Sequence, residues 1–199
     1  MLAFLATAII VELTPGPNMA TLASLTLERG RRAGFAGVAG IALGLAVVGV
    51  LASLGLTALI SGSPFLYQVL RWGGILYLLY LAYDAWRDAG ASDIAREPKD
   101  HGSLFLRGLT INLLNPKAAV FYVAILPNFV DPARSGLLAQ NLMLVAIYVA
   151  VATAIHSGIV LLAARLRPVL VAGTGERVLR RSLACLMALI AVWFAWETR

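Results

Sequence analysis

Long apolar runs, interrupted by short polar segments, make up most of the chain. Residues 2–27 contain a single charged side chain, Glu12, and residues 33–70 contain none. A membrane helix needs about 20 mostly apolar residues to cross about 30 Å of hydrocarbon. The second run is too long for one helix, and its segment 61–64 (Ser-Gly-Ser-Pro) is typical of a turn. The pattern therefore predicts helices that cross a lipid bilayer.

Applied to the whole chain, the same criterion predicts six transmembrane helices. They are expected at about 2–27, 34–60, 66–86, 104–129, 138–164 and 179–197. The only clearly polar linker is expected at about 88–103. We therefore predict an all-α integral membrane protein in which the first segment either spans the bilayer or forms a re-entrant loop.

Composition supports this class. The chain has 199 residues, of which 60% are hydrophobic and 13% are charged, against roughly 45–50% and about 25% in soluble domains. This excludes a disordered chain, a nucleic-acid-binding domain and an ordinary soluble enzyme, and makes the lipid bilayer the expected partner. The single cysteine, Cys185, excludes an intrachain disulfide and a multi-cysteine metal site. No metal, cofactor or nucleotide-binding motif is expected, so transport energy would come from a gradient or a partner chain.

The basic residues indicate an orientation. Of the 16 Lys and Arg residues, twelve fall on one side of the predicted helices, three on the other, and Lys117 falls within a helix. The twelve are Arg29, Arg31, Arg32, Arg87, Arg96, Lys99, Arg107, Arg165, Arg167, Arg177, Arg180 and Arg181. The positive-inside rule places these in the cytoplasm and both termini outside. A re-entrant first segment would move the N-terminus inside.

A weak internal repeat relates the two halves. Phe4-Leu5 and Phe105-Leu106 are separated by 101 positions, as are Pro15 and Pro116. Each half contains three predicted helices, and an odd number forces the halves into opposite orientations, as in many secondary transporters. Chance similarity between apolar segments is the alternative. The predicted single domain, 1–199, then comprises repeats at about 1–90 and 104–199.

Proline motifs are expected to break helices 1 and 4. Pro15-Gly16-Pro17 and Asn115-Pro116 lie at equivalent positions of the two halves, and proline removes a backbone hydrogen bond from a helix. Within lipid, the freed backbone groups need partners in the protein or in a wet cavity. Asn18 and Asn115 offer amide groups beside the breaks. Matched breaks point to a transporter binding site, whereas a kink used only for packing is the simpler alternative.

Glu12 and Lys117 are the charges deepest in the apolar runs. A charge at the bilayer centre costs roughly 2.5–3.5 kcal/mol, so such residues usually face a cavity and carry function. Our hypothesis is that Lys117 binds a substrate carboxylate and that Glu12 takes an amine or a coupling proton. A structural ion pair, or a Lys117 that extends to the membrane surface, is the alternative. His156 is a candidate proton relay, although a lone histidine is more often a hydrogen-bonded packing residue.

These arguments define one set of candidate residues for substrate binding or coupling. The set is Glu12, Pro15, Gly16, Pro17, Asn18, Asn115, Pro116 and Lys117, with His156 as a candidate proton relay. Outside it, Gly40 and Gly44 form a small-residue step that favours close helix contact, either within the fold or in a homodimer.

Several motifs resemble the lysine exporter (LysE/RhtB) family. They are Pro-Gly-Pro-Asn at 15–18, Gly-Arg-Arg-Ala-Gly at 30–34, Asn-Pro-Lys at 115–117 and Ile-Leu-Pro-Asn-Phe at 125–129. The resemblance implies a small multi-pass protein of the bacterial inner membrane that exports amino acids such as lysine, arginine, threonine or homoserine, driven by the proton motive force. It does not extend to Glu12 or His156. A passive channel, an exporter of another small solute, or an integral membrane enzyme are the alternatives.

Overall fold

The computed structural model describes residues 1–14, 16–55, 100–131, 133 and 135–170, together with single residues between 65 and 87 and between 181 and 196. Every regular element within these ranges is helical, so the chain is all-α as predicted. The predicted helices at 66–86 and 179–197 lie largely outside the described residues. The predicted turn at 61–64 and most of the linker at 88–103 also lie outside them.

The first apolar run forms two helices. Helix α1 spans Leu2–Leu13 and α2 spans Pro17–Arg29, and the two are bent by 57° relative to each other. Pro17 occupies the first turn of α2, where the missing N–H would have no helical partner in any case. The 12 residues of α1 extend only about 18 Å, so α1 by itself is too short to cross a bilayer.

Helix α3 spans Arg31–Ser53 and extends about 35 Å. Gly30 joins it to α2 with a φ of +86°, in the left-handed region that favours glycine. The sequence predicted a helix as far as residue 60, but α3 ends seven residues earlier. Gly55 follows with a φ of +79°, and its N–H bonds to the Ala52 carbonyl, which is a typical glycine stop after a helix.

The segment predicted as helix 4, at about 104–129 with breaks at Asn115-Pro116 and Pro127, consists of four short elements. Helix α6 spans His101–Leu113, α7 spans Pro116–Val120, a π-helical turn (η2) spans Phe121–Ile125, and a 3-10 turn (η3) spans Leu126–Phe129. Asn115 caps α7, because its side-chain oxygen accepts a hydrogen bond of 3.0 Å from the Lys117 backbone N–H.

Helix α8 spans Leu137–Leu170 and is longer than the predicted 138–164. Arg165 and Arg167 therefore lie on the helix and not in a basic loop, which corrects the prediction. The Arg167 Nε donates a 2.9 Å hydrogen bond to the carbonyl of Leu27, in the last turn of α2. This contact places the guanidinium at a helix C-terminus, where a positive charge is favourable.

Two of the described helices are long and apolar enough to cross a membrane, namely α3 and α8 up to Pro168. The bent pair of α1 and α2 meets the same test only when it is taken together. This geometry is compatible with either a broken span or a re-entrant loop, so the orientation of the N-terminus stays a prediction.

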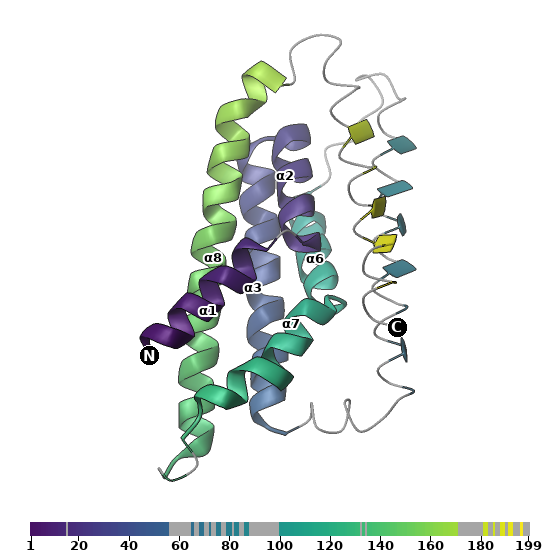
Figure 1. Cartoon of the computed structure of the whole chain (residues 1–199). Coiled ribbons are helices and arrows are strands. Elements are labelled where there is room, and N and C mark those ends of the chain that lie inside the picture. Colours follow the sequence, from purple (N-terminus) through teal and green to yellow (C-terminus); the bar gives the residue numbers. More distant parts are fainter. Residues whose placement is uncertain are drawn as a thin grey trace.

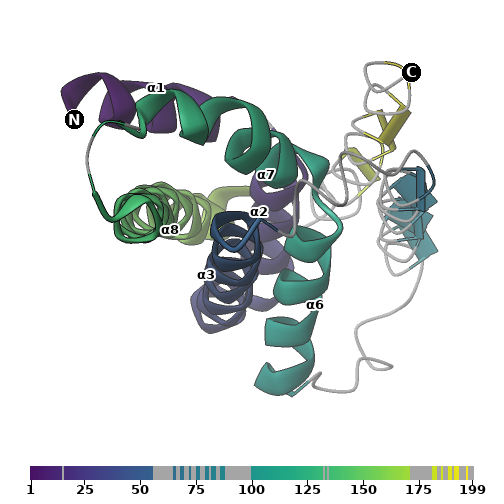
Figure 2. The ribbon, with the colours of Figure 1, turned by 90° about the horizontal axis from the view of Figure 1, so that it is seen from below.

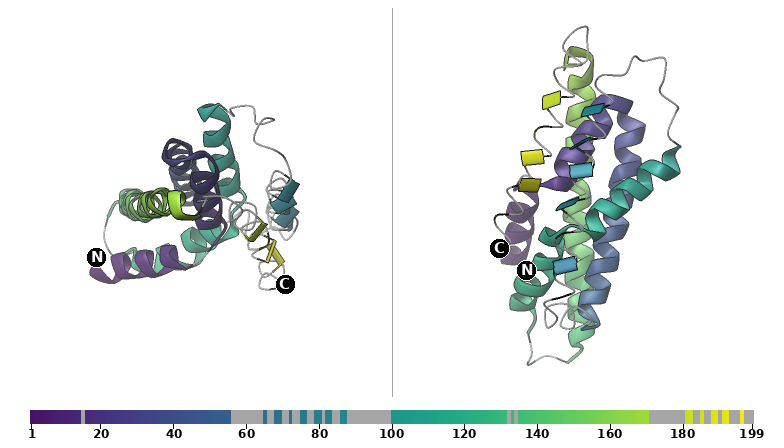
Figure 3. Two further views of the ribbon diagram at one scale, coloured as in Figure 1. Left: turned by 90° about the horizontal axis from the view of Figure 1, so that it is seen from above. Right: turned by 90° about the vertical axis from the view of Figure 1, so that its right-hand side faces the viewer.

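The helices form a row with α3 in the middle, flanked by α8 on one side and α6 on the other (Figures 2 and 3). Glycine makes the contact between α3 and α6 close. A Cβ on Gly40 would lie 2.0 Å from the Phe105 carbonyl oxygen, and one on Gly108 would lie 2.3 Å from the Gly37 carbonyl oxygen. The predicted packing role of Gly40 within the fold is therefore confirmed, while a homodimer stays a prediction.

Helix α1 and the segment from α7 to η3 run obliquely across one side of this row (Figures 1 and 2). Aromatic side chains hold them together. The Phe4 ring lies 5.2 Å from the Phe129 ring, and the Phe121 ring stacks on Tyr148 of α8 with 3.7 Å between centroids. The two short broken helices are therefore attached both to each other and to the long helix α8.

Candidate functional site

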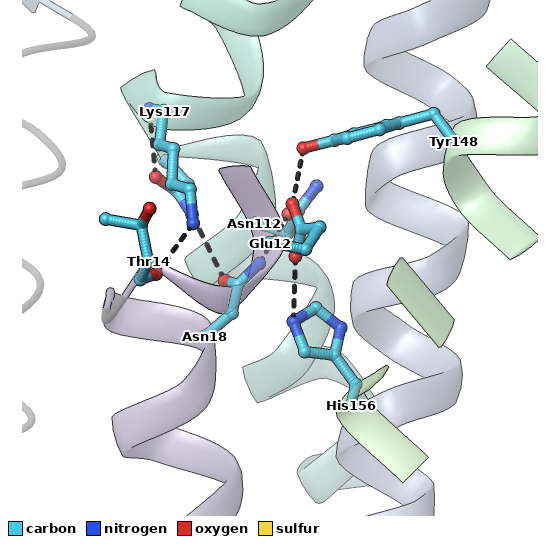
Figure 4. A network of polar contacts seen from close by, with 8 residues as sticks. Glu12, Thr14, Asn18, Asn112, Lys117, Tyr148 and His156 are labelled. Atoms are coloured by element: carbon cyan, nitrogen blue, oxygen red, sulfur yellow. Dashed lines mark hydrogen bonds and ion pairs between the residues drawn. The ribbon is translucent and has the colours of Figure 1, made fainter. Parts of the chain in front are cut away.

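The Glu12 carboxylate lies at the centre of a buried polar cluster. Its two oxygens have separate partners on α8: the Tyr148 hydroxyl donates a hydrogen bond to Oε1, and His156 Nε2 lies 3.2 Å from Oε2 (Figure 4). Glu12 is 4% exposed and His156 is 1% exposed. A carboxylate can remain at this depth because polar partners replace the water that it loses.

Three asparagine amides connect the two helix breaks. The Asn18 amide Nδ2, in the first turn of α2, donates to Asn112 Oδ1 of α6 at 3.0 Å. The Asn115 amide Nδ2 donates to Asn18 Oδ1 at 3.3 Å. All three side chains are buried. The amides therefore link the break at the start of α2 with the break before α7, in line with the need of buried polar groups for partners.

Lys117 connects α7 to the end of α1. Its Nζ donates a 2.9 Å hydrogen bond to the Thr14 carbonyl oxygen, directly after α1 (Figure 4). Carbonyl groups at a helix C-terminus lack helical donors and carry partial negative charge, so an ammonium group is favourable there. An ammonium has three N–H donors, and this contact uses one of them.

These groups surround one small pocket. Its lining residues are Glu12, Gly16, Asn18, Met19, Leu45, Asn115, Lys117, Ala118 and His156. The free volume of about 10 Å³ is enough for roughly one water molecule. In this structure the polar groups are assembled around a space that is too small for an organic solute.

The structure brings most of the candidate residues together. Six of them line the pocket: Glu12, Gly16, Asn18, Asn115, Lys117 and His156. Pro17 is buried at the start of α2 and Pro116 is in the first turn of α7. Pro15 lies outside the described residues. Among the described residues, the partners of the Glu12 carboxylate are on α8, so the contacts do not show a Glu12–Lys117 ion pair, which was the alternative to the substrate-binding hypothesis.

Sequence reasoning missed Asn112 and Tyr148. Asn112 lies three residues before Asn115, but it falls inside an apolar helix and not beside a proline. Tyr148 lies eight residues before His156, and this spacing puts both side chains on the same face of a helix. That spacing was the available signal for Tyr148, while nothing in the local sequence distinguishes Asn112 from a packing residue.

The fold and this cluster define the class of protein: an α-helical membrane protein with paired ionisable groups buried between helices. A family model described as "LysE type translocator" matches residues 9–198. The chain belongs to this family, so it is a membrane transport protein, and the alternative of an integral membrane enzyme is wrong.

Several curated proteins are similar to the chain. A homoserine/homoserine lactone efflux protein from Salmonella typhimurium is 31% identical over 195 residues, covering 97% of this chain and 94% of that protein. A leucine efflux protein from Klebsiella pneumoniae is 37% identical over 136 residues, covering 65% of this chain and 63% of that protein. An uncharacterized membrane protein from Vibrio cholerae is 34% identical over 135 residues, covering 67% of this chain and 66% of that protein. No solved structure matches the chain.

Proposed function

We propose that the protein is a secondary transporter of the bacterial inner membrane that exports amino acids. The observation that carries this proposal is the convergence of Glu12, Lys117 and the amides of Asn18 and Asn115 on one buried pocket, from segments about 100 residues apart. An amino acid has an ammonium group and a carboxylate on its α-carbon, and both groups form hydrogen bonds. The pocket offers a matching group for each of these. The names of the relatives support amino acids as the class of solute.

In the proposed binding mode, Lys117 binds the substrate carboxylate. The ammonium keeps its bond to the Thr14 carbonyl and uses its other N–H donors for the substrate. The amides of Asn18 and Asn115 and the backbone at Gly16 and Pro17 complete the site, since broken helices expose backbone groups to a ligand. Pro15 and Pro116 contribute by holding the breaks open.

Glu12 and His156 form the proposed coupling pair. A proton on this pair changes its charge, and the proton motive force can then bias the direction of transport. Tyr148 holds the carboxylate in place. Protonation of a buried carboxylate removes the cost of a charge at membrane depth, which links proton binding to the rearrangement that opens the site.

Alternating access would come from two inverted three-helix halves that rock against each other. The helix breaks support this arrangement, because α1 ends at Leu13 and α6 at Leu113, while α2 begins at Pro17 and α7 at Pro116. These positions lie within two residues of the 101-residue offset. The proposed topology has six spans, with both termini outside and the basic loops in the cytoplasm.

A passive channel is the competing transport function. The water-sized pocket favours a carrier, because a channel needs a continuous path while a carrier passes through a closed form. The test is an efflux assay on cells loaded with labelled leucine, homoserine, threonine, lysine or arginine, with and without an uncoupler. We expect saturable efflux of at least one of them, slowed by the uncoupler. Absence of efflux for every amino acid would reject the proposal, and flux that never saturates would favour the channel.

A further inference from the structure

A second pocket lies at the C-terminal end of α3, beside Ala52 and Ser53. Its volume of about 340 Å³ falls in the range of roughly 300–1,000 Å³ that is typical of small-molecule sites. Its apolar walls come from α3, η3 and the start of α8. They include Ala52, Leu126, Pro127, Val130 and Leu137. In the proposed topology this end of α3 faces the outside of the cell, which is the exit side for an exported solute.

The pocket also has one unpartnered polar group. The Tyr122 side chain lines it and is 2% exposed, and its hydroxyl makes no hydrogen bond within the part of the chain that the structure describes. A buried hydroxyl without a partner is unfavourable, and because this oxygen is itself buried, a polar group of a ligand could satisfy it only if the Tyr122 ring moved. Among the described residues that line the pocket, none is charged. The pocket therefore suits the uncharged, largely apolar part of a ligand.

Aromatic side chains connect this pocket with the Glu12 cluster. The Tyr122 ring lies edge-on to the Tyr148 ring with 5.4 Å between centroids, and the Tyr148 hydroxyl donates to Glu12. Tyr122 lies on η2, the π-helical turn Phe121–Ile125. Such turns are rare and frequently occur at functional sites. A shift of η2 would move the Tyr122 ring, which lies between the two pockets.

The charges around the first pocket limit the type of amino acid. Glu12 and Lys117 can match the ammonium and the carboxylate of a zwitterion, with His156 beside Glu12. A lysine or arginine side chain would bring a further positive charge. Among the described residues that line the two pockets, Glu12 is the only acidic one. A second positive charge would therefore lie unpaired at membrane depth, which is strongly unfavourable.

We propose that the second pocket is an exit-side binding site for the uncharged side chain of a neutral amino acid. Tyr122 forms the wall between this site and the Glu12 pocket. This inference rests on the proposed export function and narrows its substrates to neutral amino acids, such as leucine or homoserine, and not lysine or arginine. The pocket walls bind the side chain, and the charged ammonium and carboxylate of the solute stay at the pocket mouth, in contact with water on the exit side.

Thiol labelling tests occupancy directly. Asn141 lines the pocket, and a single thiol can be placed there by Asn141→Cys in a Cys185→Ser background. In the purified protein, leucine or homoserine at a saturating concentration should slow maleimide labelling at least about threefold by covering the thiol. Lysine should leave the rate unchanged. Leu142→Cys is the matched control, because Leu142 is 37% exposed and does not line the pocket, and no solute should protect it.

Filling the pocket provides a second measurement. Ala52→Phe should lower leucine efflux at least about tenfold by occupying the space of the solute side chain. Leu51→Phe is the control for added bulk, since Leu51 is 41% exposed on the same helix, and its efflux should match that of the wild type.

The outcomes separate this inference from the export function. If the wild type exports leucine but leucine does not protect the Asn141→Cys thiol, or if lysine protects it equally well, the exit-side site is overturned and export stands. If the wild type exports no amino acid, both proposals are overturned. The labelling result decides the inference even if Ala52→Phe fails to fold.

Discussion

His156 Nε2 of α8 lies 3.2 Å from Glu12 Oε2 of α1, and both side chains are buried. The contact attaches a 12-residue helix to the long helix α8 in the protein interior, where a charge without polar partners is costly. Tyr148, two turns earlier on α8, holds the other carboxylate oxygen. Any movement of α1 relative to α8 must therefore break these bonds or change the protonation of the pair.

Removal of either partner of this pair should impair both stability and coupling. Glu12→Gln or His156→Gln leaves the other group without its ionisable partner, and a buried polar group that is poorly satisfied costs about 1–3 kcal/mol of unfolding free energy. The double variant should be less destabilised than the sum of the two single variants, because it leaves no unpaired charge. Thermal melting of the purified proteins measures this double-mutant cycle.

Efflux should show the coupling role of the same pair. In Glu12→Gln, the remaining leucine efflux should no longer respond to an uncoupler. Tyr148→Phe removes one hydrogen bond to Glu12 but keeps the carboxylate, so its efflux should remain sensitive to the uncoupler. Additive stability effects, together with normal uncoupler sensitivity in Glu12→Gln, would show that the pair is only a packing feature.

Lys117→Met should abolish export while the protein still reaches the membrane. The methionine side chain has a similar length but no donor for a substrate carboxylate, and the loss of a charge-assisted contact lowers transport at least about tenfold. Lys117→Arg, which keeps the charge, should retain part of the activity. Initial rates of efflux, normalised to the amount of protein in the membrane, measure both. Normal export by Lys117→Met would contradict the substrate role and leave Lys117 only its structural contact with the Thr14 carbonyl at the end of α1.

Alanine at Gly40 should destabilise the protein strongly. The new Cβ would lie 2.0 Å from the Phe105 carbonyl oxygen, so α3 and α6 would have to separate. Overpacking of this kind typically costs about 1–3 kcal/mol. Gly158→Ala is the matched control on α8, because a Cβ added there would meet no neighbouring atom within 4 Å and alanine favours a helix by up to about 1 kcal/mol. Equal melting temperatures for the two variants would contradict the close α3–α6 contact.

A C-terminal green fluorescent fusion should be dark, and a C-terminal alkaline phosphatase fusion should be active. Both results follow from the twelve-to-three distribution of basic residues, which predicts a C-terminus outside the cell. Fluorescence and phosphatase activity of cells that express the two fusions provide the measurement. A bright fluorescent fusion would place the C-terminus in the cytoplasm and would reverse the exit side assigned to the second pocket.

The sequence by itself determined the class of the protein. Apolar runs of helical length and the scarcity of charge are local properties, so they predict an all-α membrane protein without any knowledge of packing. The proline motifs likewise led to the prediction of helix breaks, because proline acts on its own turn. Because charged residues are scarce in the apolar runs, Glu12 and Lys117 were identified as candidate site residues.

Only the tertiary structure decided how these residues are paired. Glu12 contacts His156 and Tyr148, and Asn18 contacts Asn112, across sequence separations that no local pattern encodes. These contacts depend on which faces of the helices meet, and the close approach of α3 to α6 at Gly40 helps to set that arrangement. Helix formation is a local property of the chain, whereas the polar site arises from packing between helices.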